Sequence, residues 1–243
     1  MAYRLSTEYL DNGHLKRFHE NGLIVPFKPT GYGNVDLWVS GDSVSGSTWL
    51  DKSPNGRDMT LTGSPTVSKI GGRKVVNFGT GKYANVAGWL DRTGSYTLLA
   101  LVRLNNVGGV INEIMSQDTS RMQFRFNESA KLQYEVQYAV GLEGTAVTTN
   151  IWIAAGVVFD SIAGELRLYK NGGRVTSMLH GGASGIASNF QIGAFTSEGA
   201  YYFDGSIAEA VVYSTALTDD NIAEIADSWS QGDDDLWDVP GTA

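Results

Sequence analysis

The sequence predicts an all-β fold: a two-sheet antiparallel sandwich with one short helix in its C-terminal region and an N-terminal arm. Thirty glycines among 243 residues, with few long helical patterns, favour many strands joined by tight turns. Apolar and polar residues alternate in 122–126 and 132–140, which is typical of neighbouring strands with one wet face. Residues 96–104 are apolar on both faces, which indicates a central strand buried on both sides.

The chain divides into an arm (1–34), a sandwich domain (35–230) and an acidic tail (231–243) that begins near Asp233. A short helical or irregular piece is expected around residues 10–18, and Gly and Pro break up the arm after it. The arm has too many apolar groups for water and too few for a core of its own. We expect it to bury them against a neighbouring subunit or particle shell; alternatively, it folds back over an edge of its own sandwich. The apolar residues concerned are Tyr3, Leu5, Tyr9, Leu10, Leu15, Phe18, Ile24 and Phe27.

Within the domain, strands are expected from Val35, over 151–159 and over 165–169, where Asn171-Gly172 suits a type I′ hairpin turn. One helix is predicted over 218–230. Thr218 can cap it, and an apolar face recurs at helical spacing through Ile222, Ile225, Ala226 and Trp229. The predicted core consists of Leu99, Leu101, Phe124, Tyr134, Val136, Trp152, Val158, Leu168, Ile192, Ile207 and Val211.

Three segments in the expected order resemble a known family. Residues 203–222 (FDGSIAEAVVYSTALTDDNI) read as a strand, a tight connection and a capped helix, and residues 49–58 (WLDKSPNGRD) and 75–79 (VVNFG) precede them. They are similar to motifs of the concanavalin A-like lectin/glucanase superfamily, in its laminin-G-like jelly-roll form. Pro54 stands where glycine is usual, and an aspartate usual after Phe78 is missing. The resemblance covers about 35–229 and implies a jelly roll, a fold shared by lectins, adhesins, virion proteins, glycosidases and lyases.

Composition restricts the class of partner. The formal charge of −8 disfavours nucleic acid or an anionic membrane as the main partner. No run approaches 18 apolar residues, so no membrane span is expected. Cysteine is absent, which removes disulfides and thiolate metal sites. The first residues lack the apolar stretch of a signal peptide, so we expect a protein made without one, in a virion or an extracellular surface assembly.

The catalytic sets of related enzymes are not matched. A glucanase-type Glu-x-Asp-x-x-Glu strand has no counterpart, because Glu224 and Asp227 are wrongly spaced and lie on the predicted helix. A lyase-type Gln-Ile-His strand ends here in Gly193 instead of histidine. His14, His19 and His180 do not cluster. We therefore predict that the protein is not an enzyme.

Two kinds of binding are considered. Glycan binding needs aromatic rings beside amides and carboxylates, and the candidates are Gln133, Glu135, Gln137, Tyr201 and Tyr202, with Tyr83 and Trp89 as further rings. The alternative is a plain solvated sheet face. No cofactor is expected; Ca²⁺ at the sandwich rim is conceivable at Asp204 and then Asp160, although turn carboxylates explain both.

Taken together, the sequence favours a non-catalytic structural or recognition protein of a surface assembly, a phage or virus virion component such as a decoration or tail-appendage protein. Its partners would be other copies or other virion and surface proteins, held through the arm, and a host glycan. The alternatives are a soluble or cell-surface glycan-binding module (a lectin or adhesin) and, third, a diverged polysaccharide hydrolase or lyase.

Overall fold

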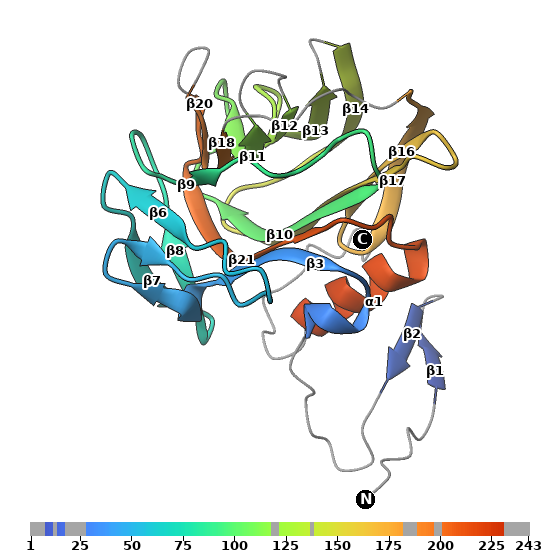
Figure 1. Ribbon diagram of the computed structural model, residues 1–243, viewed down its shortest axis with the longest axis horizontal. Helices are drawn as coiled ribbons and strands as arrows, with labels where there is room; N and C mark the ends of the chain where they lie inside the picture. Colours follow the sequence, from blue (N-terminus) through green and yellow to red (C-terminus); the bar gives the residue numbers. More distant parts are fainter. Residues whose placement is uncertain are drawn as a thin grey trace, which may run out of the picture.

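A computed structural model describes residues 8–11, 14–17, 28–117, 122–136, 139–181, 189–196 and 201–230, with backbone only for 8–11, 14–17 and 139–140. Two large antiparallel sheets face each other, with one α-helix outside them (Figure 1). This confirms the predicted jelly-roll sandwich. No helix in these ranges is long and apolar enough to cross a membrane.

The first sheet has nine strands within the described part of the chain, in the order β14-β13-β12-β11-β18-β9-β6-β5-β4. Its strands are β4 (Val44–Ser45), β5 (Thr48–Trp49), β6 (Met59–Thr62), β9 (Tyr83–Ala87), β11 (Asn112–Gln117), β12 (Met122–Phe126), β13 (Lys131–Val136), β14 (Ala139–Ala146) and β18 (Asn189–Ile192).

The second sheet has eight strands in the same ranges, in the order β17-β16-β15-β10-β21-β8-β7, with β3 also paired to β21. Its strands are β3 (Val35–Ser40), β7 (Thr66–Ile70), β8 (Arg73–Asn77), β10 (Tyr96–Leu104), β15 (Trp152–Asp160), β16 (Glu165–Lys170), β17 (Gly173–Leu179) and β21 (Gly205–Tyr213). Two short 3-10 helices, η1 (Pro29–Gly31) and η2 (Gly41–Ser43), flank β3.

The eight-stranded sheet is apolar on both faces. Leu98 and Ala100 of β10 belong to the cluster between the sheets, whereas Leu99 and Leu101 belong to a second cluster on the outer face. Every residue of the predicted core is buried, but the set is divided between these two clusters. The apolar residues on both faces of β10 are therefore explained by a second layer of packing on the outer face of the sheet.

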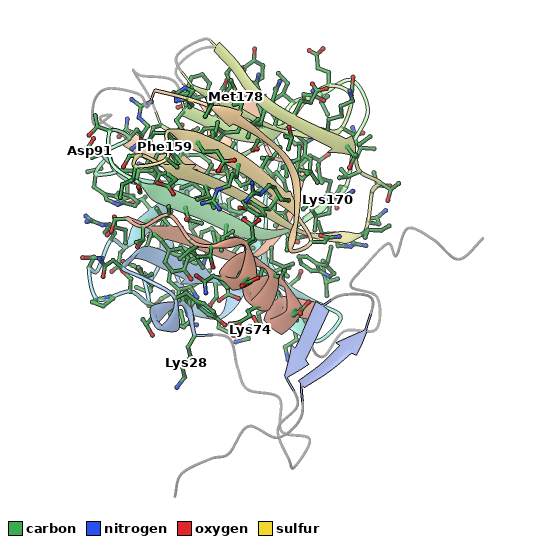
Figure 2. The ribbon with its side chains drawn as sticks, turned by 90° about the vertical axis from the view of Figure 1, so that its right-hand side faces the viewer. Lys28, Lys74, Asp91, Phe159, Lys170 and Met178 are labelled. Carbon is green, nitrogen blue, oxygen red and sulfur yellow. The ribbon has the colours of Figure 1, made fainter. Side chains whose placement is uncertain are left out.

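Helix α1 (Asp219–Ser230) supplies that layer by lying across the outer face of the eight-stranded sheet (Figure 2). Thr218 caps it as predicted: its Oγ1 accepts a hydrogen bond from the Asn221 amide at 3.2 Å. The predicted apolar face is buried. The β16–β17 turn passes close under the helix, because a Cβ on Gly172 (φ +81°) would lie 3.2 Å from the Cα of Ala223.

The early motif WLDKSPNGRD folds into a loop organised by Asp51. Its carboxylate accepts hydrogen bonds from the amides of Trp38, Ser53 and Arg57 at 2.7–2.8 Å and from the Ser53 hydroxyl at 2.6 Å. Asn55 also donates to the Val35 carbonyl at 2.9 Å. The motif therefore ties the β5–β6 connection to strand β3, which is a structural task.

The arm differs from expectation. A two-stranded sheet of β1 (Glu8–Asp11) and β2 (His14–Arg17) replaces the expected helical piece, with Asp11 opposite His14. The sequence between the strands is Asn12-Gly13, a dipeptide that favours tight hairpins and was the signal for this pairing. Strand β2 lies beside α1 (Figure 1). Tyr9, Leu10 and Leu15 are in these strands; the other predicted arm residues, Tyr3, Leu5, Phe18, Ile24 and Phe27, and the acidic tail lie outside the described residues.

Candidate functional site

One polar row runs across the outer face of the nine-stranded sheet. Residues paired across neighbouring strands point to the same side of a sheet, and here the pairing links seven polar residues in succession. The row is Thr48, Thr60, Asn85, Gln191, Ser116, Gln123 and Glu135. Their neighbours along each strand, such as Phe124 and Ile192, point into the core. Together with Thr62, Tyr83, Glu113, Arg125 and Gln133, this row is called the polar face below.

Arg125 is the centre of one half of the polar face. Its guanidinium donates to Gln133 at 2.9 Å, to Gln123 at 2.6 Å and to the Glu135 carboxylate at 2.6 Å. Gln123 in turn donates to Glu113 at 3.3 Å. The cation, two amides and two carboxylates therefore form one connected network over β11, β12 and β13.

This half of the polar face is buried, which corrects the prediction that the polar side of these strands is solvated. Gln123 is 0% exposed, Gln133 and Glu135 are 6% exposed, and Arg125 is 7% exposed. Polar side chains can be buried because they bond to one another, and alternation alone does not reveal whether a face is covered.

A short hairpin covers the neighbouring part of the polar face, over β11 and β18. Strands β19 (Ala194–Phe195) and β20 (Tyr201–Tyr202) pair with each other next to β11. The Ser116 hydroxyl donates to the Ala194 carbonyl at 2.6 Å, and the Gln191 amide donates to the Thr196 hydroxyl at 2.9 Å. Strands of two residues carry almost no periodicity, so this covering hairpin could not be predicted from the pattern of residues.

The other half of the polar face, over β5, β6 and β9, is more open. Thr60 is exposed, and Thr48, Thr62, Tyr83 and Asn85 are partly exposed. The Thr62 hydroxyl lies 3.3 Å from the side-chain oxygen of Asn85. These five residues include no Asp, Glu, Lys, Arg or His, so the open half is polar without a formal charge.

The predicted glycan residues are only partly brought together. Gln133 and Glu135 share the Arg125 network, whereas Tyr201 and Tyr202 are half-buried in β20, beside β11. Strand β13 is two strands further along the sheet, roughly 10 Å away at the usual spacing. Gln137 lies outside the described residues. Trp89 packs on Phe190, with ring centroids 4.7 Å apart, beneath the Arg57 guanidinium.

The two carboxylates considered for Ca²⁺ accept hydrogen bonds from the protein, Asp160 within a local turn and Asp204 from a distant segment. Asp160 accepts the amides of Ile162 and Ala163 at 3.0 and 3.1 Å. Asp204 accepts the Asn105 side-chain amide at 3.2 Å. Among the described residues, no three His, Cys, Asp or Glu side chains are grouped as a metal would need.

The family follows from a match to the family model of the concanavalin A-like lectin/glucanases superfamily over residues 78–223. The chain belongs to this superfamily. The match runs from the end of β8 into α1 and includes all strands that carry the Arg125 network. No curated protein matches the chain.

Several solved structures are similar to this superfamily member in fold. A Trypanosoma rangeli sialidase in complex with sialic acid aligns with a TM-score of 0.61 and 15% identity, over 88% of this chain and 37% of the sialidase chain. Domain 4 of AbnA, an extracellular arabinanase from Geobacillus stearothermophilus, in complex with arabinotriose, aligns with a TM-score of 0.63 and 17% identity, over 80% of this chain and 99% of that domain. The binding domain of Paraclostridial Mosquitocidal Protein 1 aligns with a TM-score of 0.61 and 11% identity, over 82% of this chain and 53% of that chain.

Proposed function

We propose that this protein is a non-catalytic glycan-binding module whose ligand lies on the open half of the polar face. The observation that carries the proposal is the row of paired polar residues, which ends in a neutral, accessible region over β5, β6 and β9. The arabinanase domain with arabinotriose and the sialidase with sialic acid add support only through their shared fold.

The open half offers the two kinds of contact that sugars need. The Tyr83 ring is partly exposed and can stack on the apolar face of a sugar ring, while Asn85, Thr60 and Thr62 can bond its hydroxyls. The buried half is less suitable, because Arg125 and Glu135 already satisfy each other. Its role in this proposal is to stabilise the part of the sheet next to the ligand.

Two observations favour binding without turnover. The carboxylates of Glu113 and Glu135 are buried in a network with Gln123 and Arg125, which leaves neither poised as a free acid or nucleophile. At Gly193, where related lyases carry histidine, φ is +84° and a Cβ would lie 2.8 Å from the Phe78 ring. A histidine at this position would be strained on both counts.

A glycan array, followed by titration calorimetry on any hit, tests the proposal. We expect Tyr83→Ala and Asn85→Ala each to weaken binding at least about tenfold, a loss of about 1.4 kcal/mol, with the fold intact. Asn106→Ala, at an exposed amide elsewhere, is the matched control and should bind normally. Loss only in Tyr201→Ala or Tyr202→Ala would move the site to the β19–β20 hairpin, and no hit on a broad array would refute glycan binding.

Turnover is tested separately with reducing-sugar and unsaturated-product assays on any polysaccharide that binds. Background activity is expected. Reproducible cleavage that Glu113→Gln or Glu135→Gln abolishes would assign the protein to the hydrolases instead.

Assembly into a virion or other surface structure is a second candidate function, and the apolar content of residues 1–34 favours it. Deleting residues 2–28 separates the alternatives. A truncated domain that keeps its melting temperature but loses self-association or particle attachment supports an anchoring arm. A large drop in melting temperature with unchanged assembly supports an arm packed on its own domain, consistent with the position of β2 beside α1.

A further inference from the structure

The edges of a sheet expose backbone hydrogen-bonding groups, and most edges of this molecule are protected. In the described part of the chain, the two large sheets end in strands β3, β4, β7, β14 and β17. Strand β3 is covered by the Asp51 loop, which bonds both the amide and the carbonyl of Trp38. Strand β4 has two residues, β7 carries the exposed Lys69, and β14 carries the exposed Glu143 and two register shifts. Such features keep sheet edges from pairing with other chains.

Strand β17 is the edge without such protection along its second half. Its register with β16 shifts once, beside Val175, and is regular over Thr176–Leu179. This regular stretch has no charged residue, and Met178 and Leu179 are 37% and 82% exposed. Within the described residues β17 pairs with β16 alone, so the backbone N–H and C=O groups on its other side are open to a further strand.

The nine-stranded sheet leaves this edge accessible. Its last strand, β14, lies over β16 and β17: a Cβ on Gly141 would lie 3.6 Å from the Leu166 side chain, and one on Gly144 would lie 3.3 Å from that of Val175. Both strands are on the same side of the sandwich (Figure 1). Because β14 lies over these strands and not beyond them, another strand can approach β17 in the plane of its sheet.

We propose that β17 is the interface of a symmetric dimer, in which a second copy of this chain adds its own β17 antiparallel to the first. A two-fold axis perpendicular to the sheet brings the same strand of each copy together. The two eight-stranded sheets then become one sheet across both copies, and the pairing satisfies both open edges at once.

The faces of β17 determine the register of this pairing. Thr176 is opposite Leu168 of β16, whose side chain points into the core between the sheets. Met178 shares this inner face, and Ser177 is on the outer one. Residues directly opposite in antiparallel strands share a face. With the axis at Ser177, that residue is therefore opposite itself in the second copy, and Thr176 is opposite Met178.

The composition of this stretch fits a second copy of the same strand. Two small serines meet at the axis, where a charged residue would be placed against a like charge and a large residue against its own bulk. The side chain of Met178, exposed in one copy, covers Thr176 of the other. The paired stretch is short, which suits a reversible dimer and not a permanent one.

The symmetry also gives the two polar faces a common direction. A two-fold axis perpendicular to the sheets keeps the outer faces of both nine-stranded sheets on one side of the dimer. If the open half binds glycans as proposed above, the dimer holds a glycan-bearing surface at two points. This consequence rests on the proposed function, whereas the dimer itself does not.

Sedimentation velocity of the full chain, at concentrations from micromolar to millimolar, tests the dimer. We expect a reversible equilibrium between monomer and dimer. Ser177→Lys and Ser177→Asp should each weaken association at least about tenfold, because like charges meet at the axis. An equal mixture of these two variants should restore dimers, because opposite charges then meet. Val67→Lys, at an exposed position on the β7 edge, is the matched control and should associate normally.

The proposal is overturned if the unchanged protein stays monomeric over this range, if Ser177→Lys dimerises as well as the unchanged protein, or if the mixture of charged variants stays monomeric. The second result, together with loss of dimers on deletion of residues 2–28, would assign association to the arm. Hydrogen exchange on the unchanged protein gives a check that needs no variant. Amides of residues 176–179 should gain protection at high concentration, with β10 amides as an internal reference. Equal protection at low and high concentration would also overturn the pairing.

Discussion

The hydroxyl groups of Tyr96 and Tyr134 lie 2.5 Å apart and form a hydrogen bond between the two sheets of the sandwich. Tyr96 belongs to β10 and Tyr134 to β13, and both side chains are buried. Burial raises the pKa of Tyr96 to about 12, and it also raises that of Tyr134. The pair therefore stays neutral across the ordinary pH range. Its hydrogen bond holds the two sheets in one position relative to each other at this point of the core.

Removing one hydroxyl of this pair should cost more than removing both. Tyr134→Phe leaves the Tyr96 hydroxyl buried without its partner, a penalty of about 1–3 kcal/mol. The double variant with Tyr96→Phe should lose less free energy of unfolding than either single variant, because no orphaned hydroxyl remains. Urea unfolding of the four proteins in the cycle measures this. Strictly additive losses would show that the two hydroxyls do not depend on each other.

Arg125→Met should be among the most damaging single changes on the nine-stranded sheet. It leaves Glu135 buried without its cation, at a cost of about 3–5 kcal/mol. Lys131→Met is the matched control, since it breaks an ion pair to Glu143 of similar length, 2.7 Å, between side chains that are 41% and 39% exposed. That control should cost less than about 1 kcal/mol. Equal losses in chemical denaturation would mean that the network does not stabilise the sheet.

Asp51→Ala should destabilise the β5–β6 loop and its attachment to β3. Three backbone amides and a hydroxyl lose a charged acceptor, so we expect a loss of at least about 2 kcal/mol and faster exchange at the Trp38 amide. Asp42→Ala removes a carboxylate that is 71% exposed and pairs with Lys74 at 3.4 Å. This control should be nearly neutral; the same loss in both would argue against a special role for Asp51.

Asp219 should contribute stability that is lost at low pH. Burial opposes its ionisation, but hydrogen bonds from Arg174 and Tyr169 outweigh burial and hold the pKa of Asp219 below its ordinary 3.8. Its contribution to stability is therefore present above about pH 3.8 and is lost as the pH falls through the lowered value. The melting temperature of Asp219→Asn should lie below that of the unchanged protein at pH 6, and the gap should narrow by pH 2.5. A gap independent of pH would refute this role.

The large elements could be predicted because their patterns are long. Nine residues of β10 with two apolar faces indicate a doubly buried strand, and the spacing from Ile222 to Trp229 predicts α1 and its buried face. The resemblance of 203–222 to a family motif added the jelly-roll architecture. These patterns depend on residues that are close in sequence, and contacts with distant segments do not alter them.

The parts that could not be predicted depend on contacts between distant segments. Arg125 is buried together with Gln133 and Glu135 on the neighbouring strand β13, and a period of two does not reveal such a bonded network. Glu209 does leave a signal in the sequence, because it interrupts an otherwise apolar run in β21. Its partner Trp38 is 171 positions away, so only the folded chain joins them.

Strand β21 also determines when the molecule can be completed during synthesis. It pairs with β10 on one side and with β3 and β8 on the other, so Val39 meets its partner Ala210 only after nearly the whole domain has been translated. At ribosomal speeds of 5–20 residues per second, β3 waits for roughly 10–30 seconds without a sheet partner. Non-local pairing of this kind slows folding and leaves apolar strands exposed meanwhile. The newly made chain is therefore a natural client for chaperones until its last strand is inserted.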